Sequence, residues 1–232
     1  MDFTNHNLWP FFTINGHTAY ITESILGTWI VMAALLIFTL VVRSKLKHFE
    51  EKPRPGSLQN VIELAVESMH NMAKSNLGED LSWLGGYFFG VFAFILLCNY
   101  SGLFKLRSPT ADLATTLALA MNTFFLIHIL GIVRRKGAYL KDYLKPVFLF
   151  LPMNIIGELS RPVSLSFRLF GNILGGTIML DLLYVSLPLL FRFVFPDVIH
   201  AYLDVFVGAL QSFIFCVLSM TFIKEKASEE EV

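Results

Sequence analysis

Two arginines in an apolar segment are the residues of this chain best placed to do chemistry. Residues 160–176, with the sequence SRPVSLSFRLFGNILGG, contain Arg161 and Arg168. A cation at the centre of a bilayer costs roughly 2.5–3.5 kcal/mol, so a charge there usually has a partner or a function. Arg168 has no acid three or four residues away, and its i+4 neighbour Asn172 cannot neutralise it. Its counter-charge is therefore expected from another helix or another chain.

Arg161 differs from Arg168 because an acid lies three residues before it. Glu158 and Arg161 would share one face of a helix, where opposite charges at this spacing attract each other. Two interpretations of Glu158 are therefore open, a local ion pair and a functional carboxylate.

Small and polar residues accompany Arg168. The chain continues with three small residues that allow a second helix, of this chain or of a partner, to approach closely: Gly171, Gly175 and Gly176. The last apolar stretch has a polar face whose residues recur at helical spacing: Asp204, Gly208, Gln211 and Phe215. We expect this face to contact the Arg168 face, giving two helices with a wet seam. Asp112 and Asp181 are two further acids in apolar surroundings.

Several other chemistries are not indicated. The sequence has no P-loop, no zinc-ligand spacing and no Gly-x-Ser-x-Gly motif, so we expect no catalytic residue, no metal and no cofactor. The lone His128 is expected to form a hydrogen bond in helix packing, with a proton relay as the alternative. Cys98 and Cys216 are expected to be packing residues rather than a disulfide. The remaining chemistry is the movement of ions.

The composition is that of a membrane protein. Of 232 residues, 55% are hydrophobic and only 16% are charged, whereas soluble domains carry about 25% charged residues. The formal net charge is zero, so nucleic acid is not an expected partner. Residues 1–21 contain no Lys or Arg, which argues against a cleavable signal peptide and predicts an uncleaved, polar N-terminal segment.

The hydrophobic pattern predicts an all-α polytopic membrane helix bundle in one domain, residues 1–232. A spanning helix needs about 20 mainly apolar residues, and five stretches qualify: 22–42, 81–104, 113–133, 147–187 and 197–223. Residues 147–187 would form a helix of about 60 Å, against a hydrocarbon core of about 30 Å. We therefore expect a long, strongly tilted helix or a hairpin there, and a second long, tilted helix after it. Residues 57–76 predict an amphipathic helix at the membrane surface or against a partner, or else a solvated connector.

The distribution of basic residues predicts the orientation, because Lys and Arg gather on the cytoplasmic side of spanning helices. Residues 43–54, 134–145 and 224–226 hold twelve of them, while the other side holds three, Lys105, Arg107 and Arg192. Residues 1–21 are therefore expected outside, and residues 224–232 are expected to form a cytoplasmic tail.

Three motifs together resemble a known family. SPTADLATTLALA (108–120), LPMNIIGELSRPVSLSFRLFGN (151–172) and ALQSFIF (209–215) are similar to subunit a of the F-type ATP synthases. The resemblance implies that Arg168 faces the ion-binding carboxylate of each passing c subunit, with Asn172 and Gln211 near it. It also implies an outer half-channel with Asp112 at its mouth and a half-channel carboxylate at Glu158.

The same resemblance implies a non-catalytic subunit in which ions cross through two offset half-channels beside a rotating c-ring. The residues expected to approach the ring closely are Leu169, Gly171, Gly175 and Gly176. The expected partners are the c-ring, the b subunits of the peripheral stalk, other ATP synthase subunits and membrane lipid. The expected location is the plasma (inner) membrane of a bacterium.

Two positions depart from the family pattern. Many members carry an acid where this chain has Thr177, and a His or an acid where it has Asp204. We interpret this as an acid moved from one tilted helix to the other, which preserves a carboxylate in the seam. Asn172, Thr177, Asp204 and Gln211 are expected to line the half-channels, together with Asp112 and Glu158. Protons are the expected ion, with sodium as the alternative. Two interpretations come from other classes of protein. One is a self-contained transporter in which Arg168 binds an anion, and the other is a structural membrane anchor.

Overall fold

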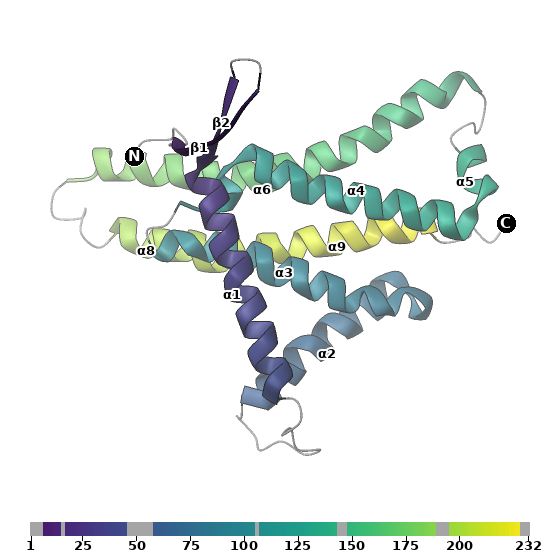
Figure 1. Ribbon diagram of the computed structural model, residues 1–232, viewed down its shortest axis with the longest axis horizontal. Coiled ribbons are helices and arrows are strands. Elements are labelled where there is room, and N and C mark those ends of the chain that lie inside the picture. The colour runs from purple at the N-terminus through teal and green to yellow at the C-terminus, as the bar shows by residue number, and fades with distance from the viewer. Residues whose placement is uncertain are drawn as a thin grey trace.

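Helices make up almost all of the chain that the computed structural model describes, which is residues 7–14, 17–45, 58–104, 107–142, 148–188 and 195–227 (Figure 1). The last part of the predicted cytoplasmic tail, 228–232, and several of the basic residues used to predict the orientation lie outside these residues. The elements run in the order β1 (Asn7–Ile14), β2 (His17–Thr22), α1 (Glu23–Lys45), α2 (Leu58–Leu77), α3 (Gly85–Tyr100), α4 (Leu113–Arg135), α5 (Gly137–Asp142), α6 (Leu151–Ser186), α8 (Phe195–Ala201) and α9 (Gly208–Ala227). A π-helical segment, η6 (Tyr202–Val207), joins α8 to α9.

Five helical segments in the described part of the chain are long and apolar enough to cross a membrane. They are Glu23–Lys45, Glu79–Leu103, Leu113–Arg135, Phe148–Ser186 and Val198–Ala227. This confirms the predicted all-α polytopic bundle. The sequence left open a long helix or a hairpin at residues 147–187. The structure has the long helix, because α6 is continuous over 36 residues despite Pro162 in its interior. At 1.5 Å per residue it is about 54 Å long, nearly twice the thickness of a hydrocarbon core.

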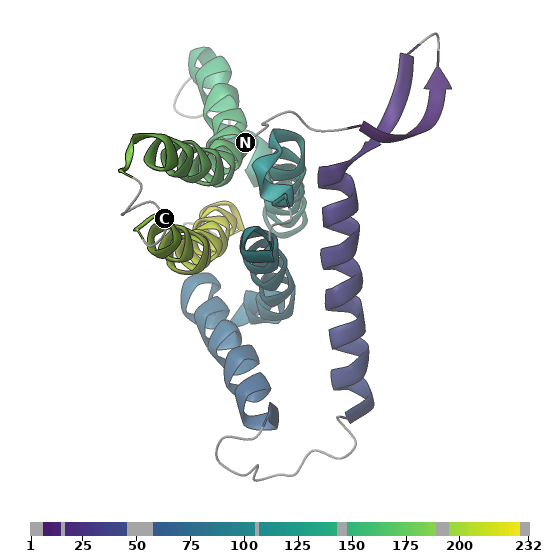
Figure 2. The ribbon, with the colours of Figure 1, turned by 90° about the vertical axis from the view of Figure 1, so that its left-hand side faces the viewer.

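The helices are arranged as a stack with one helix set across it. In Figure 1, α3, α4, α6 and α9 run along the horizontal direction, while α1 crosses them. Figure 2 shows the stack nearly end-on, with α1 standing to one side. Contacts join α4 to α6, α4 to α9 and α3 to α9, while α1 contacts α3. The helices α6 and α9 are therefore strongly inclined to α1, as two long tilted spans would be.

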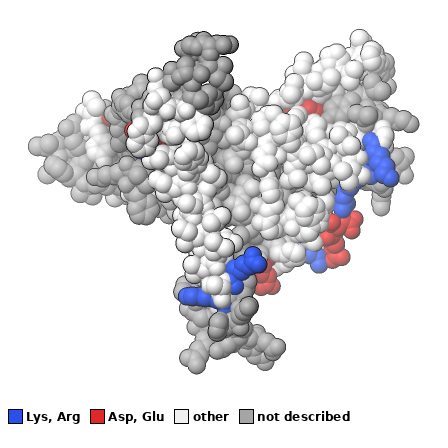
Figure 3. Space-filling view, viewed as in Figure 1, with Lys and Arg blue, Asp and Glu red and all other residues white. Residues whose placement is uncertain are grey.

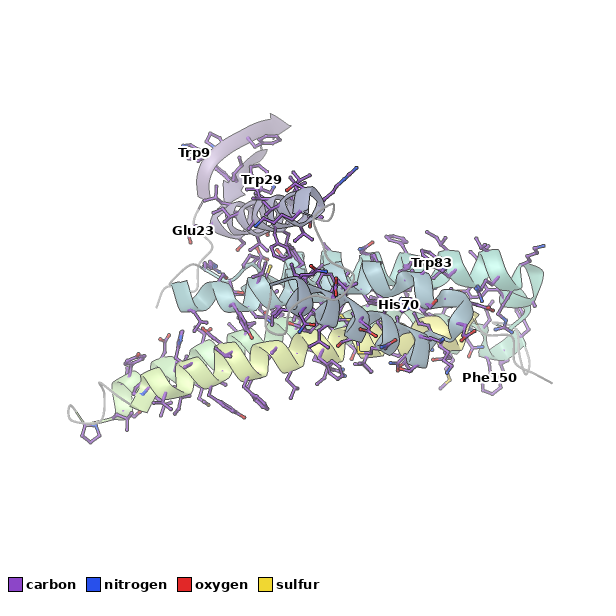
Figure 4. The ribbon with its side chains drawn as sticks, turned by 90° about the horizontal axis from the view of Figure 1, so that it is seen from below. Trp9, Glu23, Trp29, His70, Trp83 and Phe150 are labelled. Atoms are coloured by element: carbon purple, nitrogen blue, oxygen red, sulfur yellow. The ribbon has the colours of Figure 1, made fainter. Side chains whose placement is uncertain are left out.

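A β-hairpin precedes α1 and was not predicted. β1 and β2 pair antiparallel, with Ile14 opposite His17. The sequence between them, Asn-Gly, is the dipeptide most typical of a two-residue hairpin loop. Trp9 on the hairpin and Trp29 on α1 both lie away from the stack (Figure 4). The hairpin is absent from the predicted elements because these were chosen for their apolar length, and the segment around Asn-Gly is too short to cross a membrane.

The amphipathic helix predicted at 57–76 is α2, and its second half packs on the stack. Met69, Ala73 and Leu77, spaced four residues apart, are buried in a cluster with residues of α3 and α9. The first half keeps large apolar residues exposed, including Leu64 at 62%. The helix ends at Gly78, whose φ of 87° is a left-handed conformation that glycine adopts without strain. The structure therefore favours a helix held against partner helices over a solvated connector.

Three residues that the sequence predicts to be packing residues, Cys98, Cys216 and His128, lie in packed surroundings. Cys98 and Cys216 are both free thiols with fully buried side chains. The Nδ1 of His128 lies 2.8 Å from the Phe124 carbonyl oxygen, and its ring lies 4.0 Å from the Phe124 ring between centroids. These contacts fit the packing interpretation of His128.

A buried polar network ties α3 to the start of α4 and to α9. The Asn99 side chain is 1% exposed and donates to the Gly208 carbonyl oxygen at 3.0 Å. It accepts a hydrogen bond from the Thr110 hydroxyl at 2.9 Å, and Thr110 in turn is hydrogen-bonded to Ser108 at 2.7 Å. Gly208 allows a close approach here, because a Cβ at that position would lie 3.1 Å from the Asn99 Cβ, a tight contact. The Ser-Pro-Thr-Ala-Asp motif is thus a structural clasp at this end of the stack.

Replacing the centre of this clasp should destabilise the bundle. Asn99→Leu keeps a similar volume but leaves buried partners of Asn99 without their hydrogen bonds, each such group costing about 1–3 kcal/mol. We expect a clear drop in the temperature at which the detergent-purified protein loses its helical structure. Asn122→Leu is the matched control, because Asn122 is exposed and donates only to the Tyr87 hydroxyl. Equal thermal shifts for the two variants would contradict a special role for the clasp.

Candidate functional site

Arg168 lies at the centre of an exposed stripe along α6. The stripe consists of small residues with one arginine among them, at spacings of three and four residues, and every member is exposed: Gly157, Ser160, Ser164, Arg168, Gly171 and Gly175. Within the part of the chain that the structure describes, Arg168 makes no ion pair and no hydrogen bond. We call this surface the small-residue stripe. Among the described residues, it presents an unpaired cation on a helix that packs into the stack through one narrow face, which includes Leu165 and Leu169.

The glycines of the stripe leave open space beside the arginine. A Cβ built on Gly171 or Gly175 would meet no atom of the chain within 4 Å. By contrast, a Cβ on Gly176 would meet the Leu203 side chain at 3.6 Å, so Gly176 faces the neighbouring helix. Of the three glycines expected to approach a partner, Gly171 and Gly175 thus lie on the free surface, and Gly176 lies within the chain.

Leu169 does not lie on this surface. Its side chain is fully buried, in a cluster with Leu165 of α6, Ile95 of α3, Ala120 of α4 and Phe215 of α9. The expectation that Leu169 approaches a rotor is corrected on this ground. A step of 100° per residue turns Leu169 inward from its exposed neighbour Arg168.

Gln211 lies across the seam between α6 and α9. The two helices run antiparallel, with Arg161 near Phe222 towards one end and Gly176 near Leu203 towards the other. This register places Gln211 at about the level of Asn172, one turn from Arg168. Gln211 is 6% exposed, and its Nε2 has no hydrogen-bond partner among the described residues. The structure thus places Gln211 near Asn172 across the seam, about one turn from Arg168.

A carboxylate and an imidazole meet at one end of the seam. Asp204, in the π-helical segment η6, has its Oδ2 3.4 Å from Nδ1 of His200. Gly102 permits this position, because a Cβ there would lie 2.8 Å from the same carboxylate oxygen. The Asp204 side chain is 17% exposed, so it lies between the helices rather than in the surroundings. π-helical turns occur frequently at functional sites.

Two more predicted residues lie towards this end, which we call the acidic end. Asp112 caps α4, and its Oδ1 accepts a hydrogen bond from the Ala114 amide at 3.0 Å. One turn later, the Thr116 hydroxyl is 3.1 Å from that of Ser166, two residues before Arg168. The Thr177 hydroxyl donates to the Ile173 carbonyl oxygen of its own helix at 2.9 Å, so it supplies no acid to the seam.

The opposite end of the stack, which we call the basic end, holds Glu158 in an ion-pair network. Glu158 Oε1 lies 2.6 Å from Nζ of Lys226 and 3.6 Å from a guanidinium nitrogen of Arg161. The local ion pair predicted for Glu158 is therefore present, but the closer partner comes from the end of α9. Glu158 is 7% exposed.

Arg168 lies between these two ends. Ten residues separate it from Glu158, about 15 Å along the helix, and nine separate it from Thr177. Figure 3 shows that on this face the described Lys and Arg side chains gather at the lower end of α1 and at the right-hand end of the stack, with a largely uncharged surface between them. These are the ends where Arg43, Lys45, Arg134 and Arg135 close their helices.

The sequence reasoning missed several residues of this arrangement. His200 lies four residues before Asp204, a helical spacing that was available as a signal. Lys226 and Glu225 were assigned to a tail, although they extend the helical spacing of the last span. The role of Gly102 depends on a contact 102 residues distant in sequence and has no local signal.

Comparisons with known proteins identify the family of this chain. A family model described as ATP synthase A chain matches residues 25–224. The chloroplastic ATP synthase subunit a of Oedogonium cardiacum is 34% identical over 221 residues, covering 89% of this chain and 83% of the relative. ATP synthase subunit a of Nitrosospira multiformis is 33% identical (89% and 80% covered), and that of Moorella thermoacetica is 33% identical (88% and 89% covered). The chain therefore belongs to the ATP synthase subunit a family.

Proposed function

We propose that this chain is the non-catalytic stator subunit that moves protons across the membrane along a rotating ring of c subunits and so couples the proton gradient to ATP synthesis. The observation that carries this proposal is Arg168, an exposed cation in the middle of a membrane helix that has no ion-pair partner among the described residues. A cation at such a depth is costly, and an anion that comes to it lowers this cost. A rotor carboxylate that has lost its proton is an anion of the required kind.

The small-residue stripe supports a helical partner in particular. Glycines and serines allow two membrane helices to approach closely, and the free space at Gly171 and Gly175 lies beside the guanidinium. Two unit charges about 4 Å apart interact by about 4 kcal/mol at an effective dielectric near 20. This attraction favours release of the proton from a rotor carboxylate as it reaches Arg168, and the same cation repels a free cation that would leak past.

We assign the two ends of the stack to two offset half-channels. At the acidic end, Asp112, Asp204 and His200 form the outer half-channel, with Asn172 and Gln211 at its inner limit. At the basic end, Glu158 lines the inner half-channel. The rule for basic residues puts this end on the cytoplasmic side and the hairpin outside, in the plasma membrane of a bacterium.

Protons are preferred over sodium because of the pair at the acidic end. The imidazole and the carboxylate, 3.4 Å apart, are both groups that can take up and release a proton. Asp204 of η6, just before α9, then supplies the acid that Thr177 on α6 lacks. The c-ring and the b subunits of the peripheral stalk are the partners that this role requires.

Removing the cation should uncouple the complex. We expect Arg168→Ala to abolish ATP synthesis driven by a proton gradient in membrane vesicles, because a rotor carboxylate would no longer be held ionised at this point. Arg134→Ala is the matched control, since Arg134 is a partly exposed arginine at the basic end that pairs with Asp80. Normal synthesis in the Arg168 variant would overturn the proposal.

Removing the acid at the outer mouth should slow entry of protons. We expect Asp204→Asn to lower proton conduction by about 10-fold or more, since a positioned proton-transfer group contributes roughly 10²-fold or more. The measurement is proton flux through the membrane sector in reconstituted vesicles. Asp80→Asn, at an exposed position, is the control for the change in charge. Unchanged flux in the Asp204 variant would show that the acid has not moved to this helix.

A further inference from the structure

Four charged residues at the basic end join α6 to α9 in a crossed arrangement. Lys226 Nζ lies 2.6 Å from Glu158 Oε1, and Arg161 Nη2 lies 2.6 Å from Glu225 Oε1. The same Arg161 nitrogen lies 3.6 Å from Glu158 Oε1 and so links the two pairs. Each helix contributes one acid and one base, and the four formal charges cancel. We call these four residues the latch.

The latch is anchored by a contact of the arginine with an aromatic ring. The Arg161 guanidinium carbon lies 4.9 Å from the centre of the Phe222 ring, one turn before Glu225 on α9. This geometry attracts a cation to the face of the ring. The last turn of α9 is therefore held on α6 by two ion pairs and a cation–π contact.

The two ion pairs differ in burial. The side chains of Glu158 and Lys226 are 9% and 17% exposed, whereas that of Glu225 is 53% exposed. A buried pair is screened little by salt, and removing one partner leaves a charge that nothing compensates. The Lys226–Glu158 pair is thus the member of the latch that determines the charge at this depth.

The position of the pair puts it on the inner path of the proton. Glu158 lies about 15 Å along α6 from Arg168 and lines the half-channel assigned above. With Lys226 and Arg161 both on one oxygen, the carboxylate offers little net negative charge to a further cation. Its other oxygen, Oε2, is buried and accepts no hydrogen bond from the described residues. A further cation would meet the uncompensated carboxylate only when Lys226 withdraws.

We propose that Lys226 is a positioning residue that restrains the inner half-channel by holding Glu158 in an ion pair, so that opening of the latch limits proton release. The inference rests on the proposed function, because it assigns a restraint to a half-channel of that function. It gives the end of α9 a role in the rate of transport, in addition to its role in packing.

The opposite effects of removing each partner test the proposal. In vesicles that contain the whole ATP synthase membrane sector, we expect Lys226→Met to raise passive proton conduction several-fold, since the carboxylate is then less compensated. Glu158→Gln should lower it several-fold, because two cations then stand on the path without a counter-charge. Lys224→Met is the matched control and should leave conduction unchanged, since Lys224 is exposed on the same turn.

A merely structural pair predicts a different pattern, in which both single variants lose assembly and conduction together. That result would overturn the proposal, as would unchanged conduction in Lys226→Met. If Glu158→Gln does not assemble, the double variant E158Q/K226M removes both charges, and the proposal then expects assembly to return with conduction below that of Lys226→Met. Conduction in the double variant equal to that of Lys226→Met would contradict a role for the freed carboxylate. The proposed function fails separately, through normal ATP synthesis in Arg168→Ala.

Discussion

The structure depends on one electrostatic constraint, a guanidinium that is held in a membrane helix without a partner in the described chain. Arg168 lies on the outside of the stack because its neighbours Leu165 and Leu169 are buried in the core. The same helical rotation places glycines and serines on either side of the arginine. The core thus determines where the cation points, and the stripe determines how closely another helix can come.

The length of the helices separates the two proposed half-channels, which lie on either side of Arg168. Because α6 is about 54 Å long, Glu158 towards one end and Thr177 towards the other are both well separated from Arg168 along one continuous element. The segment formed by η6 and α9 runs antiparallel to it and supplies the opposing groups, Asp204 of η6 towards one end and Lys226 of α9 at the other. The two ends differ in chemistry: the acidic end pairs a carboxylate with an imidazole, and the basic end compensates its carboxylate with two cations. In our proposal this difference makes one end suited to proton entry and the other to restrained release.

Much of the architecture and of the central site could be predicted from residue patterns. The spans follow from apolar length, and the isolation of Arg168 follows from the absence of an acid one turn away. The hairpin was missed because only spanning segments were sought, although its Asn-Gly loop is a local signal. The prediction that Leu169 lies on the partner-facing surface was wrong. It put Leu169 on the same helix face as Arg168 and the glycines after it, but successive residues of a helix point about 100° apart, and Leu169 points into the core. The contacts of Lys226 with Glu158 and of Gly102 with Asp204 depend on the antiparallel register, which a local pattern does not contain.

The central claim, that the small-residue stripe faces a rotor helix, is tested most directly by two cysteines placed two residues apart. Ser164 is exposed on the stripe, whereas Ser166 is fully buried and hydrogen-bonded to Thr116 of α4. Ser→Cys changes little in volume, and both native cysteines are buried. In the whole complex, Ser164→Cys is predicted to form a disulfide cross-link with a cysteine on the outer helix of a c subunit, and Ser166→Cys is predicted to form none. Cross-linking from Ser166→Cys alone, or from neither position, would contradict the account.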